Sequence, residues 1–166
     1  ASGEKVPIQP MPGENEAAYR WNWDAPLLVS RHNASTLYFA ANKLFKSTNR
    51  GDDWTTVSPD LSRQLDRNKL EVMGQVWSMD AVMKNKSTTI YGNIVALDES
   101  PLQQGLLYTG TDDGLVQVTT DDGANWKKIE NIKGAPLQTK VNMVTASLHD
   151  VNEVFVAFNS QRSGDF

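Results

Sequence analysis

The chain has 166 residues, of which 39% are hydrophobic and 22% are charged, a balance that is ordinary for a soluble protein with a packed core. Its 16 basic and 20 acidic residues give a net charge of −4 without a basic stripe, which argues against nucleic acid as a partner. The chain contains no cysteine, so disulfides, thiol nucleophiles and cysteine-bound metals are excluded. No apolar run is long enough to span a membrane, and no signal-peptide pattern is present.

Residues 1–18 are rich in proline, glutamate and glycine and lack an apolar period, so they predict an extended leader or linker. The first repeat unit is expected at residues 19–57. It opens with an aromatic cluster at residues 19–24, which is either a packed strand or an exposed platform. Short apolar runs predict four strands in this unit, at residues 26–30, 37–41, 43–46 and 55–57.

The third and fourth of these runs are separated by a motif of the form Ser/Thr-x-Asp/Asn-x-Gly-x-x-Trp. We call it the first box, and its defining residues are Ser47, Asn49, Gly51 and Trp54. Asn49 is expected to accept hydrogen bonds from backbone N–H groups one or two residues further on, and Gly51 to supply a positive φ. The indole of Trp54 is expected to fold back over the apolar face of the hairpin. Ser47 is expected to end the incoming strand.

Residues 58–92 are expected to form an insertion or connector between units. Residues 58–63 predict a turn with a short helical start, and residues 63–69 predict a charged, solvated stretch. Residues 72–84 have a period that fits a helix or a strand. The apolar side chains of this second half are Val76, Trp77, Met79, Val82 and Met83. The insertion is either a flap that packs these side chains on a neighbouring blade or a loop over a ligand-binding face.

A second unit is expected at residues 93–130 and a third, truncated unit at residues 131–166. Strands of the second unit are predicted at residues 93–97, 107–111, 114–118 and 127–129, and those of the third at residues 141–147 and 153–158. The second unit carries a second box, with Thr119, Asp121, Gly123 and Trp126. His32 and His149 follow the first strands of their units and are expected to lie in turns.

The spacing of the units points to a β-propeller. Tyr108 and Phe155 are 47 positions apart, and four short strands with a period in the high forties are typical of a propeller blade. We therefore predict an all-β partial β-propeller of about two and a half four-stranded blades. Because closed propellers typically need four to eight blades, three arrangements remain open. The chain is a fragment of a longer polypeptide, or it completes a ring with other chains, or it leaves strand edges that a partner covers.

Residues 43–54 and 106–115 resemble the Asp-box, or bacterial neuraminidase, repeats of large exported bacterial proteins. Such proteins are described as glycosyl hydrolase-like and are likened to the propellers of sortilin and of xyloglucanases. The resemblance implies a ring of seven or more blades in a longer chain and a secreted, periplasmic or cell-surface location. Asn49 replaces the usual aspartate of the motif in the first box.

Catalysis does not follow from this resemblance. Sialidases of the superfamily carry an Arg-Ile-Pro signature, which this sequence lacks, so sialidase activity is not expected. Asp24, Asp98 and Glu99 lie near predicted first strands and are the best-placed carboxylates for another glycosidase mechanism. Asp112 and Asp113 predict a turn without a complete calcium-loop pattern. We expect no metal and no cofactor.

The function expected from the sequence is a non-catalytic binding or scaffold module for a carbohydrate or peptide ligand. The alternative is part of a glycoside hydrolase whose remaining catalytic residues lie outside this chain. The expected ligand contacts flank the first strands and the insertion, and they are Trp23, Asp24, Trp77, Tyr91 and Asn93. The expected protein partners are the remaining blades of a parent protein or another copy of the chain.

Overall fold

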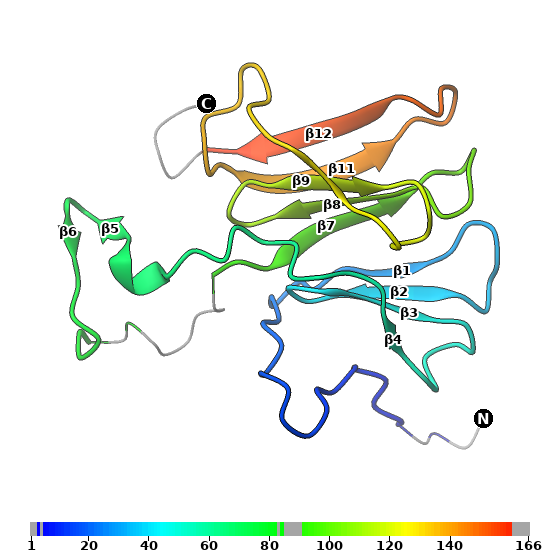
Figure 1. Ribbon diagram of the computed structural model, residues 1–166, viewed down its shortest axis with the longest axis horizontal. Helices are drawn as coiled ribbons and strands as arrows, with labels where there is room; N and C mark the ends of the chain where they lie inside the picture. The colour runs from blue at the N-terminus through cyan, green and yellow to red at the C-terminus, as the bar shows by residue number, and fades with distance from the viewer. Residues whose placement is uncertain (1–2, 4, 83, 85–90, 161–166) are drawn as a thin grey trace.

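Antiparallel sheets of four strands form most of the computed structural model, which describes residues 3, 5–82, 84 and 91–160 (Figure 1). Blade 1 contains β1 (Leu27–Val29), β2 (Leu37–Ala40), β3 (Leu44–Ser47) and β4 (Thr55–Thr56). Blade 2 contains β7 (Ile94–Glu99), β8 (Leu107–Thr111), β9 (Val116–Thr119) and β10 (Lys127–Ile129). Blade 3 is the pair β11 (Lys140–Ala146) and β12 (Val154–Asn159). Each strand pairs with its sequence neighbour, which confirms the prediction of an all-β partial propeller.

The observed strands match the predicted ones, with ends that shift by one or two residues. Their pairing registers show which positions are equivalent between blades. The first and second strands of the three blades pair in the same register, because the two partners of a pair are equally far apart in the sequence. These pairs are Leu27 with Phe39, Leu97 with Thr109 and Val144 with Val156. Leu27, Leu97 and Val144 are therefore equivalent positions of the three blades.

The insertion contains a 3-10 turn, η1 (Arg67–Lys69), and a hairpin of β5 (Glu71–Val72) and β6 (Gln75–Val76). The helical start predicted for residues 58–63 is wrong, because the helical turn begins after Asp66, whose carboxylate accepts from the Asn68 N–H. Along the ranges that the structure covers, no helix is long and apolar enough to cross a membrane. Parts of three predicted segments lie outside the described residues, namely residues 1–2 and 4, residues 83 and 85–90, and residues 161–166.

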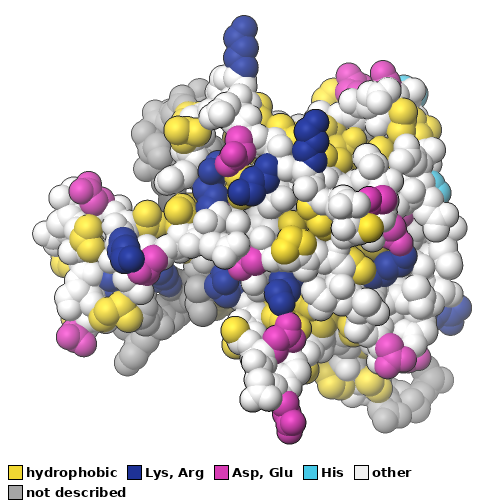
Figure 2. All heavy atoms as spheres, in the orientation of Figure 1, with side chains coloured by type: hydrophobic (Ala, Val, Ile, Leu, Met, Phe, Trp, Pro, Cys, Tyr) yellow, Lys and Arg dark blue, Asp and Glu magenta, His cyan; other side chains and the backbone are white. Residues whose placement is uncertain are grey.

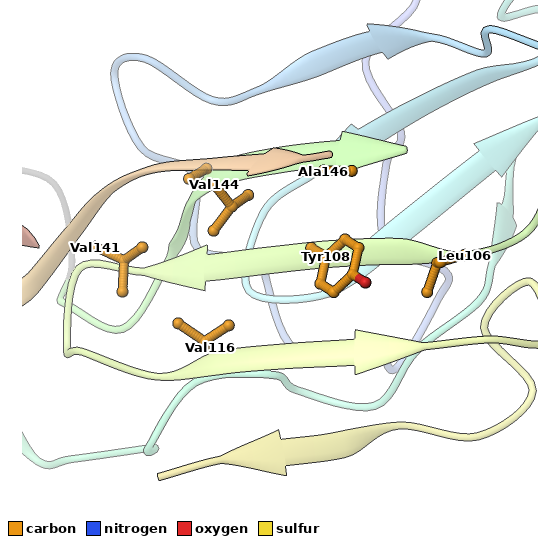
Figure 3. Packing of buried hydrophobic residues seen from close by; sticks show 7 residues of the cluster. Leu106, Tyr108, Val116, Val141, Val144 and Ala146 are labelled. Atoms are coloured by element: carbon orange, nitrogen blue, oxygen red, sulfur yellow. The ribbon is translucent and has the colours of Figure 1, made fainter. Parts of the chain in front are cut away.

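Two apolar layers hold the blades together. Between blades 1 and 2, the buried side chains are Tyr38, Ala40, Leu44, Leu61, Ile94 and Leu107. Between blades 2 and 3, they are Ala96, Leu106, Tyr108, Val116, Val141, Val144 and Ala146 (Figure 3). Burying one such aliphatic side chain stabilises a fold by about 1.5–3 kcal/mol. The blades approach closely at Gly110, where an added Cβ would lie 2.3 Å from Cγ1 of Val141.

Both boxes form the same hydrogen-bonded turn. In the first box, Ser47 Oγ accepts from Gly51 N at 2.8 Å, and in the second, Thr119 Oγ1 accepts from Gly123 N at 2.9 Å. Ser47 and Thr119 end β3 and β9, as predicted. Gly51 and Gly123 have φ values of +98° and +96°, which confirms the predicted left-handed conformation.

The side-chain acceptor of each box acts differently from the prediction. Asn49 Oδ1 accepts from Asp53 N at 3.0 Å, and Asp121 Oδ1 accepts from Asn125 N at 2.8 Å. The accepted N–H is therefore four residues further on, because the turn brings the chain back past the acceptor before the next strand begins.

The tryptophan of the second box also differs from the prediction. Trp126 packs on the apolar layer between blades 1 and 2, and its Nε1 donates to the carbonyl of Val57 at 3.1 Å. Val57 directly follows β4 of blade 1, so the indole joins its box to the preceding blade rather than only covering its own hairpin.

Candidate functional site

The long connections of the molecule meet at one end of the blades. We call this the front end, where β1, β7 and β11 begin, and the opposite end, where these strands finish, the back end. The front end carries the turns β2–β3 and β8–β9 and both ends of the insertion, and the β5–β6 hairpin projects beyond it at the left of Figure 1. Loops on a rigid scaffold are where ligand sites concentrate. The front end is therefore the candidate functional site.

Arg20 anchors the start of the insertion to the front end. Its guanidinium donates from Nη2 to Asp60 Oδ2 at 2.7 Å and to Ser62 Oγ at 2.9 Å, and from Nε to Gly92 O at 3.2 Å. Burial works to raise the pKa of Asp60, but hydrogen bonds from Ser62, Arg20 and Asn42 outweigh it and hold that pKa below its ordinary value. Asp60 is thus an ionised structural partner of Arg20.

Arg63 makes a second anchor, between the insertion and blade 2. Its backbone N donates to Asp113 Oδ2 at 2.7 Å, and its Nε donates to Asp113 O at 2.8 Å. Its Nη1 reaches Glu130 Oε1 at 3.1 Å. The prediction of a solvated stretch starting at Arg63 is wrong at this residue, because its side chain is only 19% exposed.

Asp112 fixes the other end of the insertion. Its Oδ1 accepts from Gly92 N at 3.0 Å and from Asn93 N at 2.8 Å, just before β7. Burial raises the pKa of both Asp112 and Asp113. Half-buried Tyr91 has its pKa raised to about 12 by burial and by the charges of Asp113 and Asp112.

The predicted contact residue Asn93 is fully buried beside Asp112. It has no surface to offer a ligand and serves the attachment of β7 instead. Among the predicted contacts, Tyr91 also lies in this anchoring cluster, where it is partly covered.

The projecting arm, residues 71–82, presents apolar side chains to solvent. They are Val72, Met73, Val76, Trp77, Met79 and Val82. The indole Nε1 of Trp77 donates to Val72 O at 2.9 Å, which fixes the ring against the hairpin while 43% of the residue stays exposed. Figure 2 shows hydrophobic side chains on this arm at the left of the molecule. Among the described residues, Trp77 and Met79 are thus not buried against blade 1 or blade 2, and Met83 lies outside the described residues.

Trp23 and Asp24 lie in the turn that leads into β1 at the front end. Trp23 is 80% exposed, whereas its neighbour Trp21 packs on Phe39 with ring centroids 4.7 Å apart. The aromatic cluster at residues 19–24 is thus partly packed and partly an exposed platform. Asp24 is exposed, and its backbone N donates to Asn22 Oδ1 at 3.1 Å.

The other candidate carboxylates lie at the back end, where they join the three blades. Asp98 Oδ2 accepts from Ala146 N of blade 3 at 2.9 Å, and Asp98 Oδ1 pairs with Arg31 of blade 1 at 3.2 Å. Glu99 Oε2 accepts from Arg31 N at 2.8 Å. Both carboxylates are buried, so their first role is to hold neighbouring blades together.

The two histidines lie in equivalent turns at the back end, as predicted. His32 N donates to Ser30 Oγ and His149 N donates to Ser147 Oγ, each at 3.2 Å. The imidazole Nε2 of His32 lies 2.8 Å from Ser100 O, across the boundary between blades 1 and 2. Within the described part of the chain, no group of three or more histidine or acidic side chains could hold a metal ion.

The structure brings Trp23, Asp24, Trp77 and Tyr91 to the same end of the blades and separates them from Asp98 and Glu99. Sequence reasoning missed the anchors Arg20, Asp60 and Arg63. No local pattern signalled them, because the partner carboxylates of Arg20 and Arg63 are 40 and 50 positions away in the sequence.

Comparisons with known proteins find a distant likeness to solved structures but no sequence relative. No protein-family model matches the chain, and no curated protein sequence matches it significantly. Among solved structures, the chain is similar to the crystal structure of the Niastella koreensis GH74 enzyme, with 18% sequence identity and a TM-score of 0.48. The likeness covers 81% of this chain and 19% of that enzyme, so the chain spans a small part of its length. The partial propeller is accordingly defined by the strand pairing of the blades themselves.

Proposed function

We propose that this chain is a segment of an exported β-propeller that binds a carbohydrate at the front end without transforming it. The observation that carries the proposal is the exposure of two indole rings, Trp23 and Trp77, at the end where the long connections meet. An indole face is a large, rigid apolar surface on which the C–H face of a sugar ring can stack.

The carboxylates of the front end support binding rather than hydrolysis. Asp60, Asp112 and Asp113 accept hydrogen bonds from arginine or from backbone N–H groups of the anchors, so their oxygens are already engaged. A glycosidase needs two carboxyl groups roughly 5 to 9.5 Å apart on either side of the scissile bond. Of the carboxylates that the sequence singles out for a glycosidase mechanism, Asp24 lies at the front end and the pair Asp98 and Glu99 at the back end.

Asp24 cannot pair with Asp98 or Glu99 across one sugar. Asp24 precedes β1 at the front end, whereas Asp98 and Glu99 finish β7 at the back end. A six-residue strand such as β7 is about 20 Å long, which exceeds the separation of a glycosidase pair. Asp98 and Glu99 are also adjacent in a strand, and adjacent strand residues point to opposite faces.

The proposal is tested by titrating the chain with soluble oligosaccharides and following tryptophan fluorescence and heat. We expect Trp23→Ala and Trp77→Ala each to weaken binding at least about fivefold, because each removes a stacking surface worth about 1–3 kcal/mol. Leu148→Ala is the matched control, because Leu148 is 60% exposed at the back end and should leave the affinity unchanged. Unchanged binding in both tryptophan variants contradicts the proposal, as does hydrolysis of any oligosaccharide tested.

The same site could take a peptide in place of the carbohydrate, and we place the protein outside the cytoplasm. A proline-rich or aromatic peptide would use the same rings, and it is distinguished by competition with the oligosaccharide. The location is tested by fractionating the producing cells and detecting the chain with an antibody.

A further inference from the structure

We propose that the outer face of blade 1, the face turned away from blade 2, docks a preceding propeller blade, and that residues 5–8 are the end of that blade's fourth strand. The proposal concerns the partner of this face and is independent of ligand binding at the front end. It is carried by the equivalence of positions between blades, by the surroundings of the two boxes and by one buried donor that has no acceptor among the described residues.

The first observation is exposed apolar surface on β1. Leu28 packs on the layer between blades 1 and 2, so its neighbours Leu27 and Val29 point to the outer face. They are 50% and 54% exposed. Their equivalents in blade 3, Val144 and Ala146, are buried against blade 2.

The equivalents in blade 2 behave in the same way as those in blade 3. Leu97, which corresponds to Leu27, packs on the apolar layer shared with blade 1. Glu99, which corresponds to Val29, is fully buried and accepts a hydrogen bond from Arg31 of blade 1. Wherever a preceding blade is present, it covers these two positions, so the exposed pair on β1 marks the place of another blade.

The second observation is that the side chain of Ile8 lies against the glycine of the first box, as the side chain of Val57 lies against the glycine of the second. A Cβ added at Gly123 would lie 2.9 Å from Val57 Cβ, and a Cβ added at Gly51 would lie 3.2 Å from Ile8 Cβ. Val57 follows the fourth strand of the blade that precedes the second box. The same relation at the first box makes Ile8 the residue that ends a fourth strand.

The sequence pattern at this position supports the equivalence. Val57 and Ile129 each lie three positions after a box tryptophan, and both are β-branched aliphatic residues, as Ile8 is. Each is followed by a polar residue, and Ile8 and Val57 have proline two positions further on. Residues 5–8 therefore continue the fourth-strand pattern rather than that of an unstructured linker.

The third observation is an unpaired donor at the first box. Trp126 Nε1 donates to Val57 O, but the equivalent Trp54 Nε1 is buried with no acceptor among the described residues. The N-terminal segment covers part of this face, through Trp21 on Phe39 and Tyr19 on Phe45 with centroids 4.7 Å apart in both pairs. Ile8, the counterpart of Val57, meets Gly51 through its side chain, and its carbonyl does not accept from the indole. A complete blade that held residues 5–8 as its fourth strand would bring that carbonyl to Trp54 Nε1, and buried donors are rarely left unpaired.

A fusion protein tests the proposal with residues 9–166 of the chain retained. Residues 93–129 are joined directly to residues 9–166, so that the end of a complete blade, Ile129, takes the place of Ile8. Blade 2 is a suitable blade to add, because its face toward blade 3 already packs against the apolar pair Val144 and Ala146. We expect the added blade to cover Leu27 and Val29 and to slow hydrogen exchange of the Trp54 indole N–H, measured by NMR, at least tenfold.

Two control fusions make the result specific. In the first, Leu27→Glu and Val29→Glu are introduced, and we expect the slowing to be lost. In the second, a flexible Gly-Ser linker of about ten residues separates Ile129 from Gln9, and the slowing should again be lost because the register at Gly51 is broken. An exchange rate in the direct fusion equal to that of the original chain overturns the proposal, as does equal slowing in both fusions that retain Leu27 and Val29.

Two measurements on the original chain guard against a fusion that does not fold. Ile8→Ala should speed amide exchange at Gly51 at least tenfold, as Val57→Ala should at Gly123, and no effect of Ile8→Ala overturns the assignment of residues 5–8. Light scattering tests whether a second copy of the chain covers the outer face of blade 1 instead. A dimer that Leu27→Glu and Val29→Glu dissociate would show that a second copy covers this face, and that result also overturns the proposal.

Discussion

The two boxes of this chain form the same turn in different surroundings. Their internal hydrogen bonds agree within about 0.2 Å, from the hydroxyl to the glycine N–H and from the side-chain oxygen to the N–H four residues on. The contacts of the glycine and the tryptophan differ, because blade 1 lies against the second box and the N-terminal segment lies against the first. The motif thus determines the turn, and the neighbour determines how much the turn contributes to holding blades together.

The glycines should show the largest difference between the boxes. At Gly123 an added Cβ would lie 2.3 Å from the carbonyl oxygen of Val57, whereas at Gly51 it would meet only the side chain of Ile8 at 3.2 Å. Both positions have positive φ, which costs about 1–3 kcal/mol for a residue with a side chain. We expect Gly123→Ala to lower the free energy of unfolding by about 4 kcal/mol and Gly51→Ala by about 2 kcal/mol.

Urea unfolding followed by tryptophan fluorescence measures both variants. Gly13→Ala is a suitable control, because its φ is not positive and an added Cβ would touch only the end of the Glu16 side chain, at 4.0 Å. Equal losses for Gly51→Ala and Gly123→Ala would contradict the difference in surroundings.

The hydroxyl groups should show no difference between the boxes. Ser47→Ala and Thr119→Val each leave a glycine N–H without its acceptor and remove the bond to the side-chain oxygen of Asn49 or Asp121. We expect each to lower the free energy of unfolding by about 2 kcal/mol. The neighbouring exposed threonines provide matched controls, since Thr48→Val and Thr120→Val should change stability by less than about 0.5 kcal/mol. A loss confined to one box would show that the turns are not equivalent.

Substitutions of the two tryptophans should also change the free energy of unfolding by different amounts, but the difference should be smaller than for the glycines. Trp126→Phe leaves the Val57 carbonyl without the indole donor, and we expect a loss of about 1–2 kcal/mol beyond the change in packing. Trp54→Phe removes a buried N–H that has no acceptor among the described residues, so the corresponding polar contribution should be near zero or stabilising. Urea unfolding of both variants gives the comparison, and an equal loss at the two positions would contradict it.

The positions of the strands could be predicted from the sequence because each strand is a short apolar run between turn residues. The two boxes also gave the turns correctly, since Ser47 or Thr119 and a glycine four residues later define a local geometry. Local signals of this kind do not depend on distant parts of the chain.

The contacts between blades could not be predicted in the same way. Trp126 meets Val57 69 positions away, and Arg20 meets Gly92 72 positions away, so neither partner is visible in a local pattern. The projecting arm was also ambiguous, because its apolar side chains have a period that fits a packed element, yet they remain exposed. Asn93 is the opposite case. It is a polar residue that was expected to contact a ligand, yet it is buried and donates to Asp112.

The acidic residue of the second box should give it a pH dependence that the first box lacks. Hydrogen bonds from the side chain and the backbone of Asn125 hold the pKa of Asp121 below its ordinary value of 3.8. A carboxyl group with a lowered folded-state pKa adds stability above its unfolded-state pKa, and this stability is lost as the pH falls through the folded-state value. Asn49 occupies the same position in the first box and does not titrate.

We therefore expect the free energy of unfolding of Asp121→Asn to fall less steeply with acid than that of the original chain, over the range from about pH 4 downward. Glu16, whose pKa is lowered to about 2 by hydrogen bonds from Lys43 and Tyr19, and Asp60 add acid sensitivity to both proteins, so only the difference between them reports on the box. In Asn49→Asp the new carboxylate would face that of Asp53, which Asn49 Nδ2 contacts at 2.9 Å, so the repulsion should make the acid limb shallower rather than steeper. Urea unfolding at a series of pH values measures all three proteins. Parallel curves would show that the aspartate of the second box does not distinguish it from the first, and that the two turns differ only in what lies against them.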